Sequence, residues 1–424
     1  MAQVSSIFSQ ILGLVPRRLF DAAVARHGGM RHARGFSCWD QFVAMLFCQL
    51  GQAHSLREIR EGLQACEGKL VHLGMTQAPS HSTLAYANEH RSWEIYQDLF
   101  LTLVEHLRQQ LPGAGGNPLK LPGKLLSLDS SVIDLCVKVF PWAKFRATKG
   151  AVKLHLLLDH DGLLPHYALI TDGKQADVKV AKTMCFPAGA MLIFDRGYND
   201  YEWFHNLTLQ GVHFVTRLKE RASFVVVESR AISDSSSVRA DEIIVFTKQA
   251  EADDDRFLRR IVWWDDKGKR EFVYLTNHLD LDPATVAAIY RERWQVELFF
   301  KSIKQNLRIK TFVGTSANAL KIQIWTALIA LLLVRFLELR SRVKWHTSRF
   351  IALPRRQLFV YRDLLRFIDY PFEGPVRLRP DHLPGQVPLF KPGDLPPEGQ
   401  PHLSKKEKLR QRRIIVRVHN PVPA

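Results

Sequence analysis

Three acidic residues stand where they could bind divalent metal ions. Asp129 lies within the apolar segment 124–135, which predicts a strand, and Asp195 directly follows the apolar segment 190–194. A charge on an otherwise apolar strand needs a partner or a cation, and the carboxyl ends of strands are where α/β sheets place their sites. A third acid, Glu297, lies in a single helix predicted from Pro283 to about Leu307. We therefore predict that Asp129, Asp195 and Glu297 form one catalytic, metal-binding group.

The segment around Glu297 has two contrasting faces when it is placed on an α-helix of about 100° per residue. One face gathers charged and aromatic side chains: Tyr290, Arg293, Trp294, Glu297, Lys301 and Lys304. The other face is an apolar stripe of Val296, Phe299, Phe300, Ile303 and Leu307, and it predicts that the helix packs by that side.

The charged face allows two interpretations. Arg293 and Glu297 alone could be an ordinary surface pair, which stabilises a helix by a few tenths of a kcal/mol. Aromatic rings beside Arg and Lys suit a nucleic-acid backbone and its unpaired bases instead. We therefore predict that the five residues around the acid contact nucleic acid: Tyr290, Arg293, Trp294, Lys301 and Lys304.

Two strand aspartates followed by a helical glutamate form the layout of a ribonuclease-H-like metal site. Such a site would hold Mg²⁺, and we expect Mn²⁺ to substitute for it. Asp134 and Asp172 remain open as alternative acids.

The same residues resemble a known family, the bacterial insertion-sequence transposases of the DDE type, in the subgroup with a Tyr-x-x-Arg-x-x-x-Glu-x-x-x-x-x-x-Lys signature. Tyr290, Arg293, Glu297 and Lys304 match that spacing without a gap. Asp195-Arg196-Gly197-Tyr198 is similar to the tetrapeptide around the second acid of the family, and Asp129-Ser130-Ser131 is similar to the context of the first. The likeness extends from about residue 75 to residue 340.

The resemblance implies an enzyme that cuts and joins DNA at the terminal inverted repeats of its own mobile element. The three acids would hold two Mg²⁺ ions. Tyr290, Arg293 and Lys304 would grip phosphates beside the cut, and Trp294 would stack on a displaced base. The partners would be double-stranded DNA, both terminal inverted repeats and target DNA, and a second copy of the chain in a synaptic homodimer that excises through a hairpin. Two rivals remain open: a nuclease that never joins strands, and a domesticated DNA-binding protein without catalysis.

The elements that must position these residues divide the chain into four parts. Residues 1–112 are predicted to be helical, and the resemblance implies a DNA-end-recognition region there. A ribonuclease-H-like α/β catalytic domain is predicted over 119–211 and 278–345, interrupted by a β-rich insertion at 212–277. About a hundred residues separate Asp195 from Glu297, far more than a minimal fold needs there. Residues 346–424 form a C-terminal region with a basic tail.

Composition agrees with an anionic partner. The net charge is +17, and residues 401–424 alone carry seven Lys or Arg against one Glu. Lys and Arg that neutralise phosphates release counterions, so the tail could track a DNA backbone or simply be solvated. Five widely spaced cysteines indicate neither a disulfide framework nor a zinc site. The apolar run 324–334 is about half the length of a membrane span, so we expect no membrane and a cytoplasmic protein at the bacterial nucleoid.

Other chemistry-bearing residues have a structural interpretation beside a functional one. The cluster of His155, Asp159, His160, Asp161 and His166 straddles a predicted turn without a zinc spacing, which favours structural roles. Trp263 and Trp264 could be strand core or a base-stacking site. Arg217 and Lys219 could touch DNA or belong to the surface.

Overall fold

The apolar segments that follow residue 119 form the strands of one sheet. β1 (Leu125–Leu135) pairs antiparallel with β2 (Gly150–Asp159), and β2 pairs antiparallel with β3 (Leu164–Asp172). The tight turn between β2 and β3 needs Gly162, whose φ of +76° favours glycine. The computed structural model describes residues 5–31, 35–66, 68–111, 119–143, 149–232, 237–247, 256–309 and 311–372.

Two further strands, β4 (Met191–Phe194) and β5 (His213–Arg217), run parallel to β1. β4 pairs with β1, and β5 pairs with β4. Parallel strands need crossover connections, and these contain α7 (Asp177–Ala181) and α8 (Tyr201–Leu209). The first four residues of β1 have a strand on both sides and are buried. Residues 129–132 extend beyond the end of β4 and are only partly buried.

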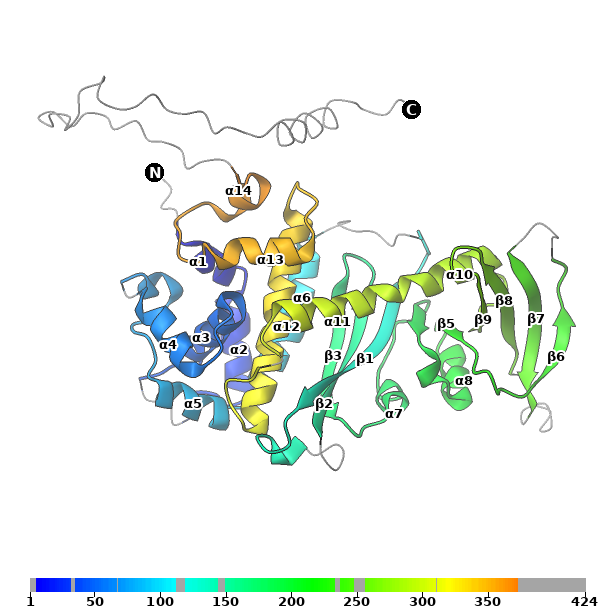
Figure 1. The fold of residues 1–424 in the computed structure, drawn as a ribbon, viewed down its shortest axis with the longest axis horizontal. Coiled ribbons are helices and arrows are strands. Elements are labelled where there is room, and N and C mark those ends of the chain that lie inside the picture. Colours follow the sequence, from blue (N-terminus) through cyan, green and yellow to red (C-terminus); the bar gives the residue numbers. More distant parts are fainter. Residues whose placement is uncertain are drawn as a thin grey trace, which may run out of the picture. The chain divides into compact units, whose positions relative to one another are not determined.

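The remaining four strands extend the same sheet. β9 (Arg270–Thr276) pairs antiparallel with β5, and β8 (Leu258–Asp265), β7 (Val238–Phe246) and β6 (Phe224–Ser229) follow as an antiparallel meander. The strand order is β3-β2-β1-β4-β5-β9-β8-β7-β6, with β6 at the far edge (Figure 1). The predicted mixed α/β fold is confirmed. A separate insertion at 212–277 stays a prediction, and β5, within that range, lies between β4 and β9.

Two helices, not one, follow β9. The sequence predicts a single helix from Pro283 to about Leu307, and this is wrong, because the structure has α10 (Pro283–Glu292) and α11 (Trp294–Asn306). At Arg293 the backbone tightens: its N–H donates to the carbonyl of Tyr290, three residues back rather than four.

Both helices pack on the sheet by their apolar sides. Val286, Ala287 and Ile289 of α10 share a core with residues of β1, β4 and β5. The apolar stripe predicted for α11 is buried as expected at Val296, Phe300, Ile303 and Leu307, with Phe299 partly buried beside it. The charged side of α11 borders the part of β1 beyond the end of β4, where Lys304 donates to the carbonyl of Val132.

A long apolar helix, α12 (Ala317–Arg340), is the centre of the helical part. This helix is long and apolar enough to cross a membrane. The expectation that the apolar segment around 324–334 is too short for a membrane span is therefore corrected. However, 89% of its most apolar window is buried inside the described structure. It packs against α3, α5 and α6 (Figure 1), so its composition is that of a core helix.

The N-terminal residues form helices, as predicted. They are α1 (Ile7–Gly13), α2 (Arg17–Arg26), α3 (Cys38–Gly51), α4 (Leu56–Gln64), α5 (His81–His90) and α6 (Glu94–Gln109). Ser55 caps α4 as its sequence indicates, since its side chain accepts from the N–H of Glu58. One hydrophobic core joins these helices to α12 and to one face of β1, β2 and β3.

Two short helices after α12 were not predicted, α13 (Thr347–Arg355) and α14 (Leu364–Asp369). Their sequences are rich in Pro and aromatic residues and show no clear period. Residues 112–118, between the predicted helical part and the predicted catalytic domain, lie outside the described residues, and so does the basic tail at 401–424.

Candidate active site

Asp129 and Asp195 occupy equivalent positions on neighbouring parallel strands. The last parallel pair joins Leu128 of β1 to Phe194 of β4. Asp129 directly follows Leu128, and Asp195 directly follows Phe194. β4 ends at Phe194, so from Asp129 onwards β4 no longer pairs with that edge of β1. Because successive residues of a strand face opposite sides of the sheet, Asp129 shares its face with Leu125, against which α10 packs.

The turn after β4 fixes the carboxylate of Asp195. Its Oδ1 accepts a hydrogen bond from the N–H of Gly197 at 2.8 Å. A Cβ atom on residue 197 would lie 2.9 Å from that same oxygen. Glycine therefore permits the close turn, which gives a physical reason for the Asp-Arg-Gly sequence.

Arg293, at the junction of α10 and α11, links Glu297 to Asp129. Its Nη2 lies 2.6 Å from Oε1 of Glu297, and its Nη1 lies 3.9 Å from Oδ2 of Asp129. Its Nε is buried and has no hydrogen-bond partner among the described residues. The guanidinium thus acts as a counter-ion for two of the three predicted acids.

The electrostatics at Asp129 are those of crowded carboxylates. Burial is the largest cause that raises the pKa of Asp129 to about 6; the charges of Asp195 and Glu297 add to it, while the N–H of Ser130 and the charge of Arg293 oppose it. A divalent cation between carboxylates would relieve this repulsion.

The donor chemistry therefore suits a hard divalent cation, which prefers carboxylate oxygens. In the described residues, however, no three His, Cys, Asp or Glu side chains converge closely enough to bind one ion. Arg293 is the neighbouring cation in this arrangement, so Glu297 would have to exchange it for a metal ion.

An open groove of about 460 Å³ runs along α11 beside the acids. It is lined by Asp129, Ser130, Ser131, Glu297, Phe300, Lys301, Lys304 and Gln305. Lys304 donates from Nζ to the backbone carbonyl of Val132 at 2.9 Å and so ties α11 to β1. Lys301 is exposed.

The structure does not bring all the predicted nucleic-acid contacts to this groove. The ring of Tyr290 lies 5.3 Å from that of Tyr274 on β9, and burial raises the pKa of its hydroxyl. Trp294 is 57% exposed at the start of α11, outside the groove lining. The tightened turn at Arg293 and the packing of Tyr290 on β9 separate residues that an ideal helix would align.

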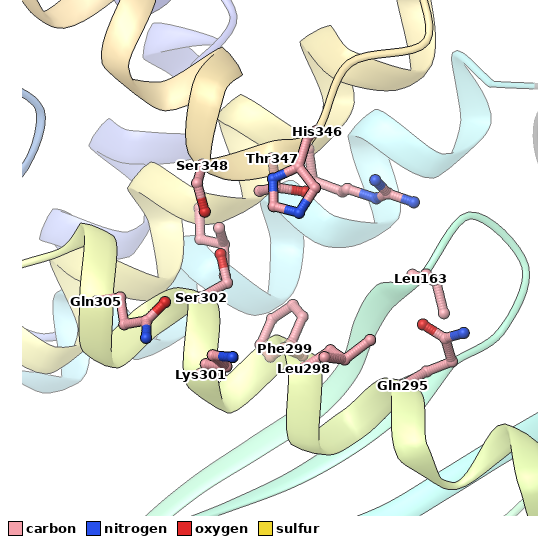
Figure 2. Close-up of a pocket in the computed structure, with 12 residues that line it drawn as sticks. Leu163, Gln295, Leu298, Phe299, Lys301, Ser302, Gln305, His346, Thr347 and Ser348 are labelled. Atoms are coloured by element: carbon pink, nitrogen blue, oxygen red, sulfur yellow. The ribbon is translucent and has the colours of Figure 1, made fainter.

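A second pocket, of about 270 Å³, lies between α11, α12 and the start of α13 (Figure 2). It shares Lys301 and Gln305 with the groove. His346, Thr347 and Ser348 face it from the start of α13, which explains why the sequence could not reveal it. These contributions meet only through tertiary packing.

The alternative candidates have structural partners. Nε2 of His155 lies 2.8 Å from the Thr171 hydroxyl, and Nε2 of His160 lies 2.7 Å from that of Ser127. Asp159 is paired with Lys124 and Arg108. Asp134 and Asp172 are exposed side chains on β1 and β3.

The residues around the meander also make local contacts. The guanidinium of Arg217 lies 5.1 Å from the ring of Phe272, and Nζ of Lys219 donates to the carbonyl of Asn199. Trp263 is partly buried against the core of α10, and Trp264 donates to Asp266.

A mixed sheet that carries Asp129 and Asp195 beside a cationic helix is an arrangement that could hold metal ions next to a phosphodiester. Residues 121–333 match the family described as "Transposase DDE domain", and residues 3–76 match a "Domain of unknown function (DUF4372)". The chain belongs to the DDE transposase family of bacterial insertion sequences and is therefore an enzyme that acts on DNA.

Two relatives of this chain are also named as transposases. A Sinorhizobium fredii protein named as transposase y4zB is 31% identical over 73% of this chain and 86% of its own. A Geobacillus stearothermophilus protein, named as a transposase for insertion sequence element IS5377, is 29% identical over 65% of this chain and 72% of its own. A solved piggyBac transposase synaptic complex with hairpin DNA has 11% identity and a TM-score of 0.40, over 90% of this chain and 86% of that one.

Proposed function

We propose that this transposase cleaves DNA at the terminal inverted repeats of an insertion sequence and joins the freed ends to target DNA. Asp129, Asp195 and Glu297 would hold two divalent ions, Mg²⁺ or Mn²⁺. The observation that carries this proposal is the equivalent position of the two aspartates, each one residue beyond the last pair of β1 and β4, with Arg293 joining Asp129 to Glu297 of α11. DDE family membership supports a dependence on divalent metal.

Each acid would have a defined task. Asp129 and Asp195 come from rigid strands and a tight turn, so they would hold fixed positions, while Glu297 would release Arg293 to complete the site. Bound there, the metal ions would activate the attacking hydroxyl and neutralise the leaving oxygen. Arg293, once freed, would remain within reach of a phosphate beside the cut, and no covalent bond to the protein is required.

The DNA would run along the groove of α11. Lys301 is exposed there and would contact a phosphate directly. Lys304 would contact a phosphate after giving up its hydrogen bond to the carbonyl of Val132. Trp294 would stack on a displaced base, which its 57% exposure allows. Tyr290 would act mainly by supporting Arg293, whose guanidinium lies 5.7 Å from its ring.

The strand order β3-β2-β1-β4-β5 supports a ribonuclease-H-like catalytic domain, which we place at 119–211 and 278–345. Its fifth strand, β5 (213–217), falls just inside the range proposed for the insertion. In this proposal the β6–β9 meander belongs to an insertion at 212–277, residues 1–112 recognise the element ends, and residues 346–424 add a C-terminal region. The Tyr290, Arg293, Glu297 and Lys304 signature would place the chain in that transposase subgroup. Two copies would act together as a homodimer on paired ends.

A joining assay tests this function. Purified protein would be incubated with Mg²⁺, a linear DNA that carries the inverted repeats flanking its gene, and a supercoiled target plasmid. We expect cleaved ends and end–plasmid joints, neither of which Glu297→Gln should produce. Cleavage without joints would indicate the nuclease alternative. Specific DNA binding with no cleavage would indicate a domesticated binding protein.

A further inference from the structure

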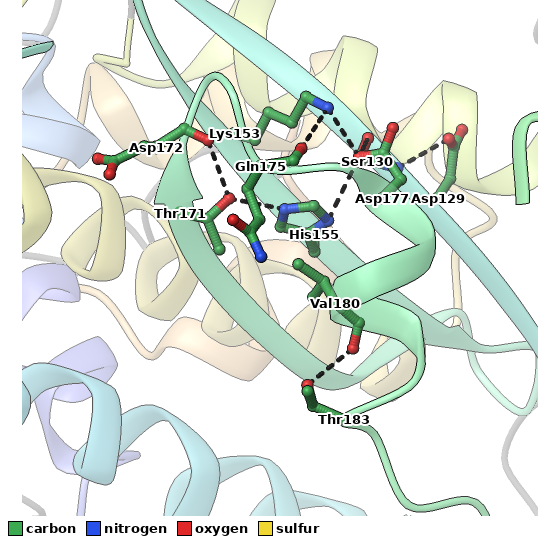
Figure 3. Close-up of polar contacts among 10 residues, drawn as sticks. All are labelled: Asp129, Ser130, Lys153, His155, Thr171, Asp172, Gln175, Asp177, Val180 and Thr183. Carbon is green, nitrogen blue, oxygen red and sulfur yellow. Dashed lines mark hydrogen bonds and ion pairs between the residues drawn. The ribbon is translucent and has the colours of Figure 1, made fainter.

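A fourth carboxylate, Asp177, lies on the opposite face of the sheet from the acids. It is the first residue of α7. Its Oδ1 accepts hydrogen bonds from Oγ of Ser130 at 2.7 Å and from Nζ of Lys153 at 3.0 Å (Figure 3). Nδ1 of His155 lies 3.6 Å away, but burial lowers the pKa of that imidazole to about 4, so it is neutral at pH 7.

The register of β1 and β2 explains why these groups meet. Ser130 pairs with His155, and Val132 pairs with Lys153. Side chains two residues apart on a strand share a face, so Ser130, His155 and Lys153 project together toward α7. Lys153 is only 14% exposed, and its charge is offset by Asp177.

Ser130 connects this cluster to Asp129. Its Oγ is held by Asp177, and its backbone N–H donates to Oδ1 of Asp129 at 2.8 Å. Ser130 thus forms hydrogen bonds on both faces of β1, just beyond the last residue of β1 that pairs with β4. The hydrogen bond that Ser130 donates to Asp177 replaces part of the restraint that a neighbouring strand gives elsewhere.

The same helix reaches the second aspartate. α7 packs against the turn Arg196–Tyr198, which follows Asp195 directly. The side chain of Tyr198 is 2% exposed, and burial, together with the charges of Asp129 and Asp177, raises the pKa of its hydroxyl. Asp177 therefore stands where β1, β2 and the turn after β4 meet.

We propose that Asp177 is a positioning residue: through Ser130 and the turn at Tyr198 it fixes Asp129 and Asp195 relative to each other so that both can bind metal. This inference rests on the proposed function of the three acids. Residues behind metal ligands commonly set the orientation of those ligands, and their removal typically weakens metal binding by about 10- to 100-fold.

Titration of the full-length, DNA-free protein with Mn²⁺, followed by electron paramagnetic resonance of the free ion, tests the proposal. Asp177→Ala should weaken Mn²⁺ binding about tenfold. Ser130→Ala should do the same, because it breaks the same link, and the double variant should be no weaker than either single one. Asp280→Asn, which neutralises an exposed loop aspartate, is the matched control and should bind like the parent.

Folding is checked by circular dichroism, and Asp177→Asn, which keeps the shape and can still accept from Ser130, should restore most of the affinity. Parental Mn²⁺ affinity in folded Asp177→Ala or Ser130→Ala, or additive losses in the double variant, would overturn the role of Asp177. Asp129→Ala separates the two proposals. If it abolishes Mn²⁺ binding while Asp177→Ala does not alter it, only the positioning role fails; if Asp129→Ala also binds normally, the proposed metal site itself fails.

Discussion

Asp129 and Asp195 stand at the same level of two adjacent parallel strands, each one residue beyond the pair Leu128 and Phe194. β4 stops there while β1 continues, so both aspartates stand beside the edge of β1 that β4 no longer pairs with. Glu297 and Arg293 approach this edge from the helical side, where Arg293 bonds Glu297 at 2.6 Å. The charges of Asp195, Arg293 and Glu297 all act on Asp129.

The counter-ion role of Arg293 predicts a stability change that depends on metal. Without metal, Arg293→Gln should destabilise the fold by about 1 kcal/mol, because the acids lose their shared cation while Glu297, 35% exposed, keeps some solvation. With Mn²⁺ the loss should shrink, since the ion replaces the guanidinium charge. Thermal unfolding in EDTA and in Mn²⁺ measures both values. Arg291→Gln, two residues earlier and exposed, should show no such metal dependence.

The raised pKa of Asp129 predicts how stability varies with pH. Its folded value of about 6 exceeds the unfolded value, so the folded state binds the extra proton between roughly pH 4 and pH 6. Stability of the metal-free parent should therefore fall as pH rises through that window, by on the order of 2–3 kcal/mol from this group.

Asp129→Asn removes this titration. Urea unfolding at several pH values in EDTA should show the variant more stable than the parent at pH 7, with the gap closing towards pH 4. An equal difference at all pH values would mean that Asp129 has an ordinary pKa.

The exposed position of Lys301 predicts a direct phosphate contact. Lys301→Ala should weaken binding to end DNA and reduce the slope of log affinity against log salt by about 0.9, the value for one phosphate. Lys267→Ala, which removes an exposed charge from the turn between β8 and β9, should leave the slope unchanged. Fluorescence anisotropy between low and moderate salt measures both slopes. An unchanged slope for Lys301→Ala would exclude that contact.

Much of this arrangement could be predicted from local sequence. Asp129 and Asp195 stand out because each lies in or directly after an apolar run, and the stripe on α11 identified its buried side correctly. The helical projection failed at Arg293 because it assumes a constant 100° per residue. At Arg293 the backbone N–H donates to the carbonyl three residues back, as in a 3-10 turn, instead of four residues back. Tyr290 consequently packs on β9 instead of lining the groove.

Contacts between distant residues could not be predicted in this way. Asp177 belongs to no recognisable sequence motif. It contacts Ser130, 47 residues earlier in the sequence, only because the β1–β2 register and the crossover place α7 against β1. The pocket beside α11 likewise needs α13, whose sequence has no clear period. Local patterns specify which residues are unusual, while topology decides which of them meet.

The most direct test of the central claim is the single-turnover rate of Mg²⁺-dependent cleavage of DNA that carries the element's inverted repeats. Asp129→Asn, Asp195→Asn and Glu297→Gln would be compared with the parent and with Asp280→Asn. Because metal ions contribute several kcal/mol to such reactions, each of the three should lower the rate by more than about a thousandfold, while Asp280→Asn keeps the parental rate. A parental rate in any one of the three folded variants would contradict the proposed site.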